Sequence, residues 1–379
     1  MIYLDNAATT PMSEEVRAAM APYLDSVYGN PSSTHQAGRQ ARQAVDHARR
    51  IIASWLCAPS SQLVFTSGGT EANAMALVGT YLARRKTRRH IVTTQIEHHA
   101  VLHTLDFLES LGALVTRLPV DKWGYVDPDE VVRALRPETG LVSVMAVNNE
   151  LGTIEPLAAI AALVKQADAE VLVHSDMVQA LPVTPHPLSD TLVDLASFSA
   201  HKIHGPKGIG ALYVRDRIAW QPIQHGGQQE HRRRGGTENV AGIVGFGAAV
   251  AQLEHNFVEH QIKLQQLHEG LWQGLAMAIP DIVRLSPPGG VPTILNVAFP
   301  GVRNDTLLMR LDMAGIALSA GSACTAGSLE PSHVLEACGH VPWLQNAIRF
   351  SLSEQNTFAE MDETVHVVAT IVDELVKRV

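Results

Sequence analysis

One aspartate and one lysine follow apolar segments that are typical of buried strands, and together they could hold a cofactor. Asp176 comes just after the apolar residues 170–174, and Lys202 comes just after residues 194–199. A lysine amine can hold an aldehyde as a Schiff base, and a carboxylate can keep a heteroaromatic ring nitrogen protonated, so that the ring accepts electrons. Each residue taken alone is more often a solvated charge. As a pair at consecutive strand ends they are what a pyridoxal phosphate enzyme requires.

A short glycine-rich turn could hold the phosphate group of such a cofactor. Ser67, Gly68, Gly69 and Thr70 precede a helix-like pattern. Glycines let backbone N–H groups approach an anion, and the N-terminus of a helix favours negative charge. The alternative is that Thr70 is a simple N-cap. The turn matches neither the dinucleotide fingerprint nor the Walker A loop.

Polar side chains near other strand ends each have two possible roles. His98 could stack on a cofactor ring and move protons, or it could cap a helix, and the neighbouring His99 is an equal candidate. The amides of Asn149 and Gln179 could reach a ring hydroxyl, although isolated amides are more often turn or surface residues. Polar or glycine clusters end five of the apolar segments, at residues 66–70, 97–99, 148–150, 175–176 and 199–202. Because ligands bind at the carboxyl ends of strands in an open α/β sheet, five such clusters favour a site.

A sheet is needed to bring these strand ends together. Strand-like and helix-like segments alternate over the first 215 residues, which predicts βαβ crossovers and a largely parallel sheet. The predicted strands are residues 62–66, 90–96, 114–120, 141–147, 170–174, 194–199 and 210–214. The connection between the last two has no helical pattern, so the seventh strand should be antiparallel. The predicted fold class is therefore α/β, with a mixed, mostly parallel seven-stranded sheet.

A change of pattern later in the chain predicts a second, smaller domain. A glycine- and arginine-rich stretch at 226–236 precedes a long helical region at 239–277, and a Pro-Pro-Gly-Gly breaker at 287–290 precedes a compact α+β pattern. We therefore predict a large domain at residues 12–255 and a small α+β domain at residues 1–11 and 256–379.

The composition excludes several other classes of protein. The chain has 379 residues, a formal net charge of −9 and three cysteines. The acidic total argues against a dedicated nucleic-acid binder, and three cysteines without a CxxC pair argue against a disulfide scaffold or a structural zinc site. The first residues lack the pattern of a signal peptide, and the longest apolar run, 240–253, is too short to span a bilayer. We expect a cytoplasmic protein with no nucleic-acid or membrane partner.

The order and spacing of nine motifs resemble those of one enzyme family over nearly the whole chain. The motifs are YLDNAATT at 3–10, TSGGTEAN at 66–73, EHHAV at 97–101, NNELG at 148–152, HSDMVQA at 174–180, SFSAHKIHGPKGIGALYV at 197–214, GGTENV at 235–240, SAGSACTAGSLEPSHVL at 319–335 and IRFSL at 348–352. On these residues the chain resembles the cysteine desulfurases of the NifS/IscS type, within the class V aminotransferase-like, fold-type I pyridoxal phosphate enzymes. The resemblance implies a homodimer with pyridoxal 5'-phosphate as cofactor and L-cysteine as substrate.

The resemblance also implies a role for each site residue. Lys202 holds the cofactor aldehyde, Asp176 pairs with the pyridine nitrogen, and His98 stacks on the ring as a catalytic group. Arg349 receives the substrate carboxylate. The remaining cofactor contacts are Asn149 and Gln179 near the ring hydroxyl, Gly69, Thr70, Ser199 and His201 at the phosphate, and Thr237 at the phosphate of the other subunit's cofactor. None of these residues is assigned to a metal.

Cys324 is, by the same resemblance, the sulfur acceptor. Members of the family form L-alanine from L-cysteine, leave a persulfide on this cysteine, and pass the sulfur to an acceptor such as an iron–sulfur scaffold protein or a thio-cofactor pathway. The surroundings of Cys324 agree, because a segment rich in Gly, Ala and Ser cannot pack tightly around a structural cysteine. We interpret Cys57 and Cys338, which follow more apolar patterns, as buried structural residues.

Two other interpretations remain. A selenocysteine lyase or another class V aminotransferase would keep Lys202 and Asp176, although an ordinary aminotransferase has no use for Cys324. A sulfur carrier or scaffold protein with a vestigial cofactor site belongs to a different class, and the intact set of site residues argues against it. Visible absorbance of a bound cofactor would separate this second class from the enzymes.

Overall fold

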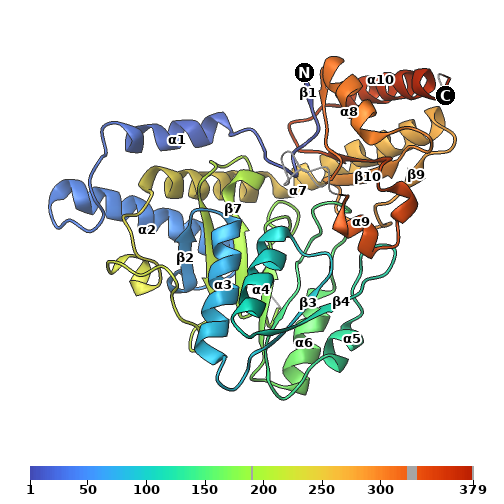
Figure 1. Ribbon diagram of the computed structural model, residues 1–379. Coiled ribbons are helices and arrows are strands. Elements are labelled where there is room, and N and C mark those ends of the chain that lie inside the picture. The colour runs from blue at the N-terminus through green and yellow to red at the C-terminus, as the bar shows by residue number, and fades with distance from the viewer. Residues whose placement is uncertain (189–190, 322–330, 378–379) are drawn as a thin grey trace.

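A seven-stranded mixed sheet forms the larger part of the molecule in the computed structural model, which describes residues 1–188, 191–321 and 331–377 (Figure 1). Its strands are β2 (Leu63–Thr66), β3 (His90–Thr94), β4 (Leu114–Leu118), β5 (Thr139–Ser143), β6 (Leu172–Asp176), β7 (Leu195–Ser199) and β8 (Gly210–Val214). Their order is β2-β8-β7-β6-β5-β3-β4, and β8 is antiparallel to both of its neighbours. The predicted mixed, mostly parallel sheet with an antiparallel seventh strand is confirmed.

The register of β8 brings two polar strand ends together. Gly210, the first residue of β8, pairs with Thr66 at the end of β2 on one side and with Ser199 at the end of β7 on the other. Since β2 and β7 are both antiparallel to β8, they end at the same edge of the sheet. The turns that follow Thr66 and Ser199 therefore lie close together.

Successive residues of the strands are buried under helices on opposite faces of the sheet. Val64 and Ile91 belong to an apolar cluster with α3 and α4, whereas the next residues, Phe65 and Val92, belong to a cluster with α2, α6 and α7. Burial on both faces explains why the strands are continuous apolar runs without alternation. The helices of this part are α1 (Glu14–Leu24), α2 (Gln36–Leu56), α3 (Gly69–Arg84), α4 (His99–Ser110), α5 (Pro128–Arg133), α6 (Leu157–Ala167) and α7 (Val240–Ala278).

The second part of the fold joins the two ends of the chain. Figure 1 shows the N-terminus in the same region as α8 and α10. Ile2 and Leu4 pack there in one apolar cluster with Leu271 of α7 and Val368 of α10. The antiparallel sheet β12-β10-β9 and the parallel pair β1-β11 belong to this part. Its elements are β1 (Ile2–Tyr3), β9 (Val283–Arg284), β10 (Ile294–Ala298), α8 (Asn304–Met313), β11 (Ile316–Ala317), α9 (His333–Ala337), β12 (Ala347–Ser351) and α10 (Phe358–Val376).

The predicted domain boundary falls inside a continuous helix. Helix α7 has 39 residues, and Phe246 in its first half packs under the large sheet while Leu271 in its second half packs against the C-terminal part. The division between residues 255 and 256 therefore stays a prediction, since one helix connects the two clusters. Long as α7 is, neither it nor any other helix in the described part of the chain is apolar enough over a sufficient length to cross a membrane.

Two of the three cysteines lie in the described residues, and they differ in burial. Cys338 is buried, as predicted, and burial raises the pKa of its thiol to about 12. Cys57 is exposed, so the prediction of a buried structural residue is wrong for it. Cys57 is the C-cap of α2 and has the left-handed conformation, with φ 55°. This geometry ends the helix at Cys57, although the apolar residues before it predict that the buried helix continues. Cys324 lies outside the described residues.

Candidate active site

A cavity of about 210 Å³ collects most of the predicted site residues at the carboxyl ends of the central strands. The predicted residues that line it are Gly69, Thr70, His98, Asn149, Asp176, Gln179, Ser199, His201, Lys202 and Arg349. Parallel strands end at one edge of a sheet, so residues that are far apart in the chain meet there. Asn73, Met145, Val178 and the N-terminal residues Ala7 and Ala8 complete the lining.

The start of α3 forms an end of the cavity that is suited to an anion. Because α3 begins at Gly69, its first backbone N–H groups have no partner within the helix, and the helix dipole favours negative charge there. A larger residue could not replace Gly69 without a shift, since a Cβ would lie 2.8 Å from Val178 Cγ2. His201 lies beside this end, where burial and the charge of Lys202 lower its pKa to about 4. His201 is therefore neutral near pH 7 and can offer one ring N–H.

Lys202 is positioned by the N-terminal segment of the chain. It lies in the turn directly after β7, and its Nζ donates hydrogen bonds to Ala7 O at 2.5 Å and to Ala8 O at 2.7 Å. The Gln179 side chain donates to the same Ala7 carbonyl at 2.9 Å. The N-terminal segment thus fixes both the amine and the amide at the cavity.

Asp176, the last residue of β6, is anchored through both of its carboxylate oxygens. Oδ1 accepts a hydrogen bond from Val178 N–H at 3.0 Å, and Oδ2 accepts one from Asn73 Nδ2 at 2.6 Å. Asp176 is only 6 % exposed. Each carboxylate oxygen has two lone pairs, so the side chain can still accept a hydrogen bond from a protonated ring nitrogen.

The structure shows which of the two neighbouring histidines, His98 or His99, lies at the cavity. The spacing of residues in the sequence could not decide between them. His98 lines the cavity and also caps α4, because its Nδ1 accepts a hydrogen bond from Ala100 N–H at 3.0 Å. That bond assigns the proton of the neutral ring to Nε2. His99 instead lies against the rings of His103 and His333, at centroid distances of 4.9 Å and 4.6 Å. The capping role considered for His98 is confirmed, and its role at a cofactor ring stays a prediction.

Glu97, the neighbour of His98, is a buried carboxyl group that supports the site. Burial raises its pKa to about 8. Its Oε1 accepts hydrogen bonds from Thr94 Oγ1 at 2.8 Å and from Met145 N–H at 2.9 Å. The group is mostly protonated near pH 7, and it ties the end of β3 to the segment that carries Met145 to the cavity.

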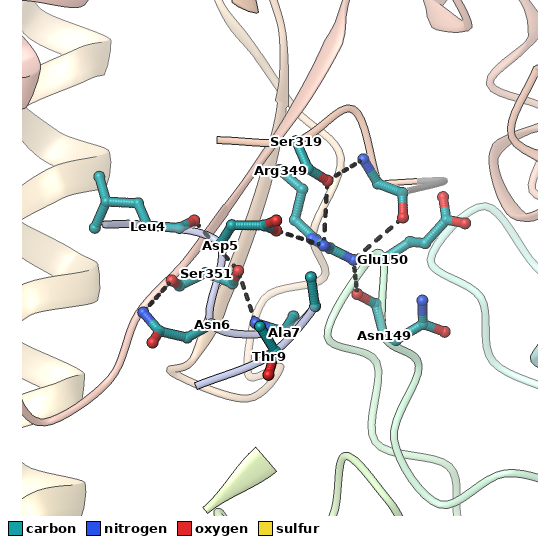
Figure 2. A network of polar contacts seen from close by, with 12 residues as sticks. Leu4, Asp5, Asn6, Ala7, Thr9, Asn149, Glu150, Ser319, Arg349 and Ser351 are labelled. Carbon is teal, nitrogen blue, oxygen red and sulfur yellow. Dashed lines mark hydrogen bonds and ion pairs between the residues drawn. The ribbon is translucent and has the colours of Figure 1, made fainter. Parts of the chain in front are cut away.

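Arg349 on β12 is 2 % exposed, and its guanidinium joins segments that are distant in the chain (Figure 2). Nη1 donates to Asn149 O at 2.9 Å and to Gly321 O at 3.2 Å. Nη2 donates to Asp5 Oδ1 at 2.9 Å and to Ser319 Oγ at 3.2 Å. Its Nε is buried and has no hydrogen-bond partner within the described residues. Arg349 also lines the cavity, so its positive charge lies where a ligand carboxylate could bind.

Comparisons with known proteins agree with this geometry. Residues 2–364 match the family described as aminotransferase class-V. A cysteine desulfurase IscS of Dictyoglomus turgidum is 42 % identical over 99 % of this chain and 95 % of its own length. The chain belongs to the class V aminotransferase family, among the cysteine desulfurases of the NifS/IscS type. Enzymes of this family depend on pyridoxal phosphate.

Solved structures of similar proteins confirm the predicted fold-type I class. A NifS-like protein with 37 % identity has a TM-score of 0.93 over 98 % of this chain and 99 % of its own. A structure described as SspA in complex with cysteine has 34 % identity and a TM-score of 0.80, over 94 % of this chain and all of its own, 100 %.

Two residues of the predicted desulfurase site are not among those that line the cavity. Thr237 lines a separate hollow with Ser67 and Arg234, and its role toward another subunit stays a prediction. Cys324 lies outside the described residues, so its role stays a prediction as well. The last residue described before it, Gly321, accepts a hydrogen bond from Arg349.

Sequence reasoning missed two features of the desulfurase cavity. Asn73 lies one helical turn after Gly69 and Thr70, and this i, i+3 and i+4 spacing on one helix face could have indicated it. The carbonyls of Ala7 and Ala8 give no side-chain signal. They reach Lys202 only because the N-terminal segment lies beside the C-terminal part of the chain, where β1 pairs with β11.

Proposed function

We propose that this chain removes the sulfur of L-cysteine with pyridoxal 5'-phosphate bound in the cavity, and leaves L-alanine and a persulfide on Cys324. The observation that supports this most directly is that Lys202, Asp176 and Arg349 line a single cavity. They provide an amine for the cofactor aldehyde, a carboxylate for the ring nitrogen and a guanidinium for the substrate carboxylate. Each of these groups serves amino-acid chemistry on this cofactor.

The residues present fit the cofactor in charge and in hydrogen-bonding capacity. The N-terminus of α3, with Ser199 and His201 beside it, suits the phosphate group. Asp176 has a lone pair for the ring nitrogen, and Asn149 and Gln179 lie at the same cavity for the ring hydroxyl. The bound cofactor supplies an electron sink for the electron pair released at the substrate carbon.

The chain's own groups bind the substrate and move its protons. The Arg349 fork binds the substrate carboxylate and so fixes the substrate relative to Lys202. The Lys202 amine takes the proton from the substrate Cα. His98 lines the cavity with its proton on Nε2, and it can exchange this proton with the reacting groups.

Sulfur transfer requires a thiolate. The thiolate of Cys324 forms a bond to the substrate sulfur as the bond between that sulfur and carbon breaks. The electron pair of the broken bond stays with the carbon fragment, which takes a proton and leaves as alanine. Atoms and electrons balance without an oxidant, because one sulfur–sulfur bond replaces one carbon–sulfur bond. An acceptor protein, such as an iron–sulfur scaffold, then removes the outer sulfur.

A homodimer is part of the proposal. Thr237 is not among the residues that line the cavity of its own chain, and the family resemblance assigns it to the cofactor phosphate of a second copy. We expect sedimentation equilibrium to give twice the mass of 41.0 kDa. A monomeric species with full activity would contradict the role of Thr237.

The reaction is tested by incubating the cofactor-loaded protein with L-cysteine and a thiol reductant. We expect alanine and sulfide in equal amounts, because the reductant releases the persulfide sulfur as sulfide. Transfer of the amino group to an added 2-oxo acid would identify an aminotransferase, and turnover of L-selenocysteine with no turnover of L-cysteine would identify a selenocysteine lyase. Either result would contradict the proposed desulfurase reaction.

A further inference from the structure

Asn73 shares one face of α3 with the residues at the anion end of the cavity. It follows Gly69 and Thr70 by four and three residues, so all three side-chain positions lie on the same helix face. All three line the cavity. The helix therefore connects the anion end with the carboxylate of Asp176, which Asn73 contacts.

The contact with Asp176 is short and buried. Asn73 Nδ2 lies 2.6 Å from Asp176 Oδ2, and Asn73 is only 1 % exposed. The other carboxylate oxygen is held by Val178 N–H. With Asn73 absent, the described residues would hold the carboxylate through Oδ1 alone, and it could rotate about its terminal torsion, which is intrinsically soft.

A comparison with Asn148 indicates that Asn73 does more than stabilise the fold. Asn148 is also buried, but both polar atoms of its amide form hydrogen bonds. Its nitrogen donates to Ile96 O, and its oxygen accepts from the N–H groups of Glu150 and Leu151. The Asn73 oxygen is buried without a hydrogen-bond partner in the described part of the chain. Leaving a buried polar atom unsatisfied costs stability. An amide that served only the stability of the fold would not be expected to leave its oxygen unsatisfied. The hydrogen bond from Asn73 to Asp176 instead indicates a role at the carboxylate.

We propose that Asn73 is a positioning residue that acts through Asp176 and aims its carboxylate at the ring nitrogen of the cofactor. The inference rests on the proposed function, in which the cavity binds pyridoxal phosphate. Helix α3 then sets two points of the cofactor at once: its first turn holds the phosphate, and Asn73 fixes the group that recognises the opposite side of the ring.

The test compares two ligands on the cofactor-free protein. One is pyridoxal phosphate, and the other is its analogue in which a carbon atom replaces the ring nitrogen. For Asn73→Ala we expect the Kd of pyridoxal phosphate to rise at least about tenfold, as for a lost hydrogen bond to a charged group. The Kd of the analogue should change less than about twofold, since it cannot use the carboxylate as an acceptor. Retained affinity for the analogue shows that the cavity of the variant is intact.

The matched control is Thr80→Ala, a buried position on the same helix that is not among the residues that line the cavity. It should leave both Kd values unchanged. If Asn73→Ala is insoluble, Asn73→Ser is measured in its place, with the same expectation.

Three results would overturn the inference. An unchanged Kd for pyridoxal phosphate in Asn73→Ala would show that Asp176 binds the ring nitrogen without Asn73. An equal loss of affinity for both ligands would show a general distortion of the cavity. If the unaltered protein bound no pyridoxal phosphate, the proposed function would fail and the inference with it. The first two results overturn the positioning role alone.

Discussion

The two ends of the cavity are built in different ways. At the cofactor end, Gly69, Asp176 and Ser199 each lie at or just after the end of a strand of one sheet. At the substrate end, Arg349 contacts Asp5, which is 344 residues away in the chain. The first end follows from local segments and the order of strands, whereas the second depends on the chain ends coming together.

This difference predicts different consequences of substitution. Gly69, Asp176 and Ser199 at the cofactor end are positioned by strands of the sheet, so removal of such groups should change the chemistry more than the fold. Arg349 is a buried cation that bonds three segments and pairs with Asp5, and loss of one partner of such a pair leaves the other charge uncompensated. Substitutions there should change both substrate affinity and stability.

The largest effect is expected for Lys202→Ala. We expect turnover to fall by about 10³-fold or more, because the group that moves the Cα proton is lost. The visible absorbance of the bound cofactor should disappear, while the circular dichroism spectrum stays unchanged. Lys122→Ala, which removes an exposed lysine, is the control and should behave as the unaltered protein. Retained visible absorbance and activity in Lys202→Ala would reject the assignment.

Arg349→Lys should separate substrate binding from cofactor binding. A lysine cannot reproduce the fork, so we expect the KM for L-cysteine to rise by about tenfold or more, with the bound cofactor unchanged. The Tm should fall as well, because the bonds to Asn149 and Gly321 are lost. Arg303→Lys alters an exposed Arg–Asp pair and should change neither quantity. A lower Tm with an unchanged KM would show that Arg349 is structural only.

Glu97, next to His98 at the cofactor end, should make the free energy of unfolding depend on pH. Its pKa is raised by burial from 4.5 to about 8, so the unfolded chain releases this proton from about pH 4.5 upward while the folded chain keeps it. The stabilising contribution is complete below pH 4.5 and is lost as the pH rises toward 8. Glu97→Gln cannot lose a proton, so its free energy of unfolding should rise relative to the unaltered protein between pH 5.5 and 8.

Urea denaturation at the two pH values measures this difference. The buried Glu155, whose pKa is also raised to about 8, is present in both proteins, so the comparison isolates Glu97 to a first approximation. A difference that does not depend on pH would contradict the raised pKa of Glu97.

The two described cysteines should give the smallest effects, and unequal ones. Cys338→Ser places a hydroxyl in a buried apolar cluster and should cost about 1–3 kcal/mol of stability. Cys57→Ser changes an exposed residue and should cost less than about 0.5 kcal/mol. Thermal denaturation of both variants checks this order, and desulfurase activity should be unchanged in each. Equal costs would contradict the difference in burial.

The cofactor end was predictable from the sequence because its information is local. An apolar run followed by a polar residue indicates a strand end, and the missing crossover before residue 210 gave the direction of β8. The partners of Lys202 were not predictable, since backbone carbonyls of Ala7 and Ala8 have no sequence signal. The exposure of Cys57 was missed because a left-handed C-cap interrupts the helix that its apolar neighbours suggest.

The most direct test of the account is alanine formation by Cys324→Ala. The variant should bind the cofactor with unchanged visible absorbance, since the groups that line the cavity remain. It should form neither a persulfide nor alanine from L-cysteine at a significant rate, because no thiolate is present to take the sulfur. Cys57→Ala and Cys338→Ala are the controls and should remain active. Alanine released by Cys324→Ala at the rate of the unaltered protein would contradict the account, and would indicate a lyase that needs no acceptor thiol.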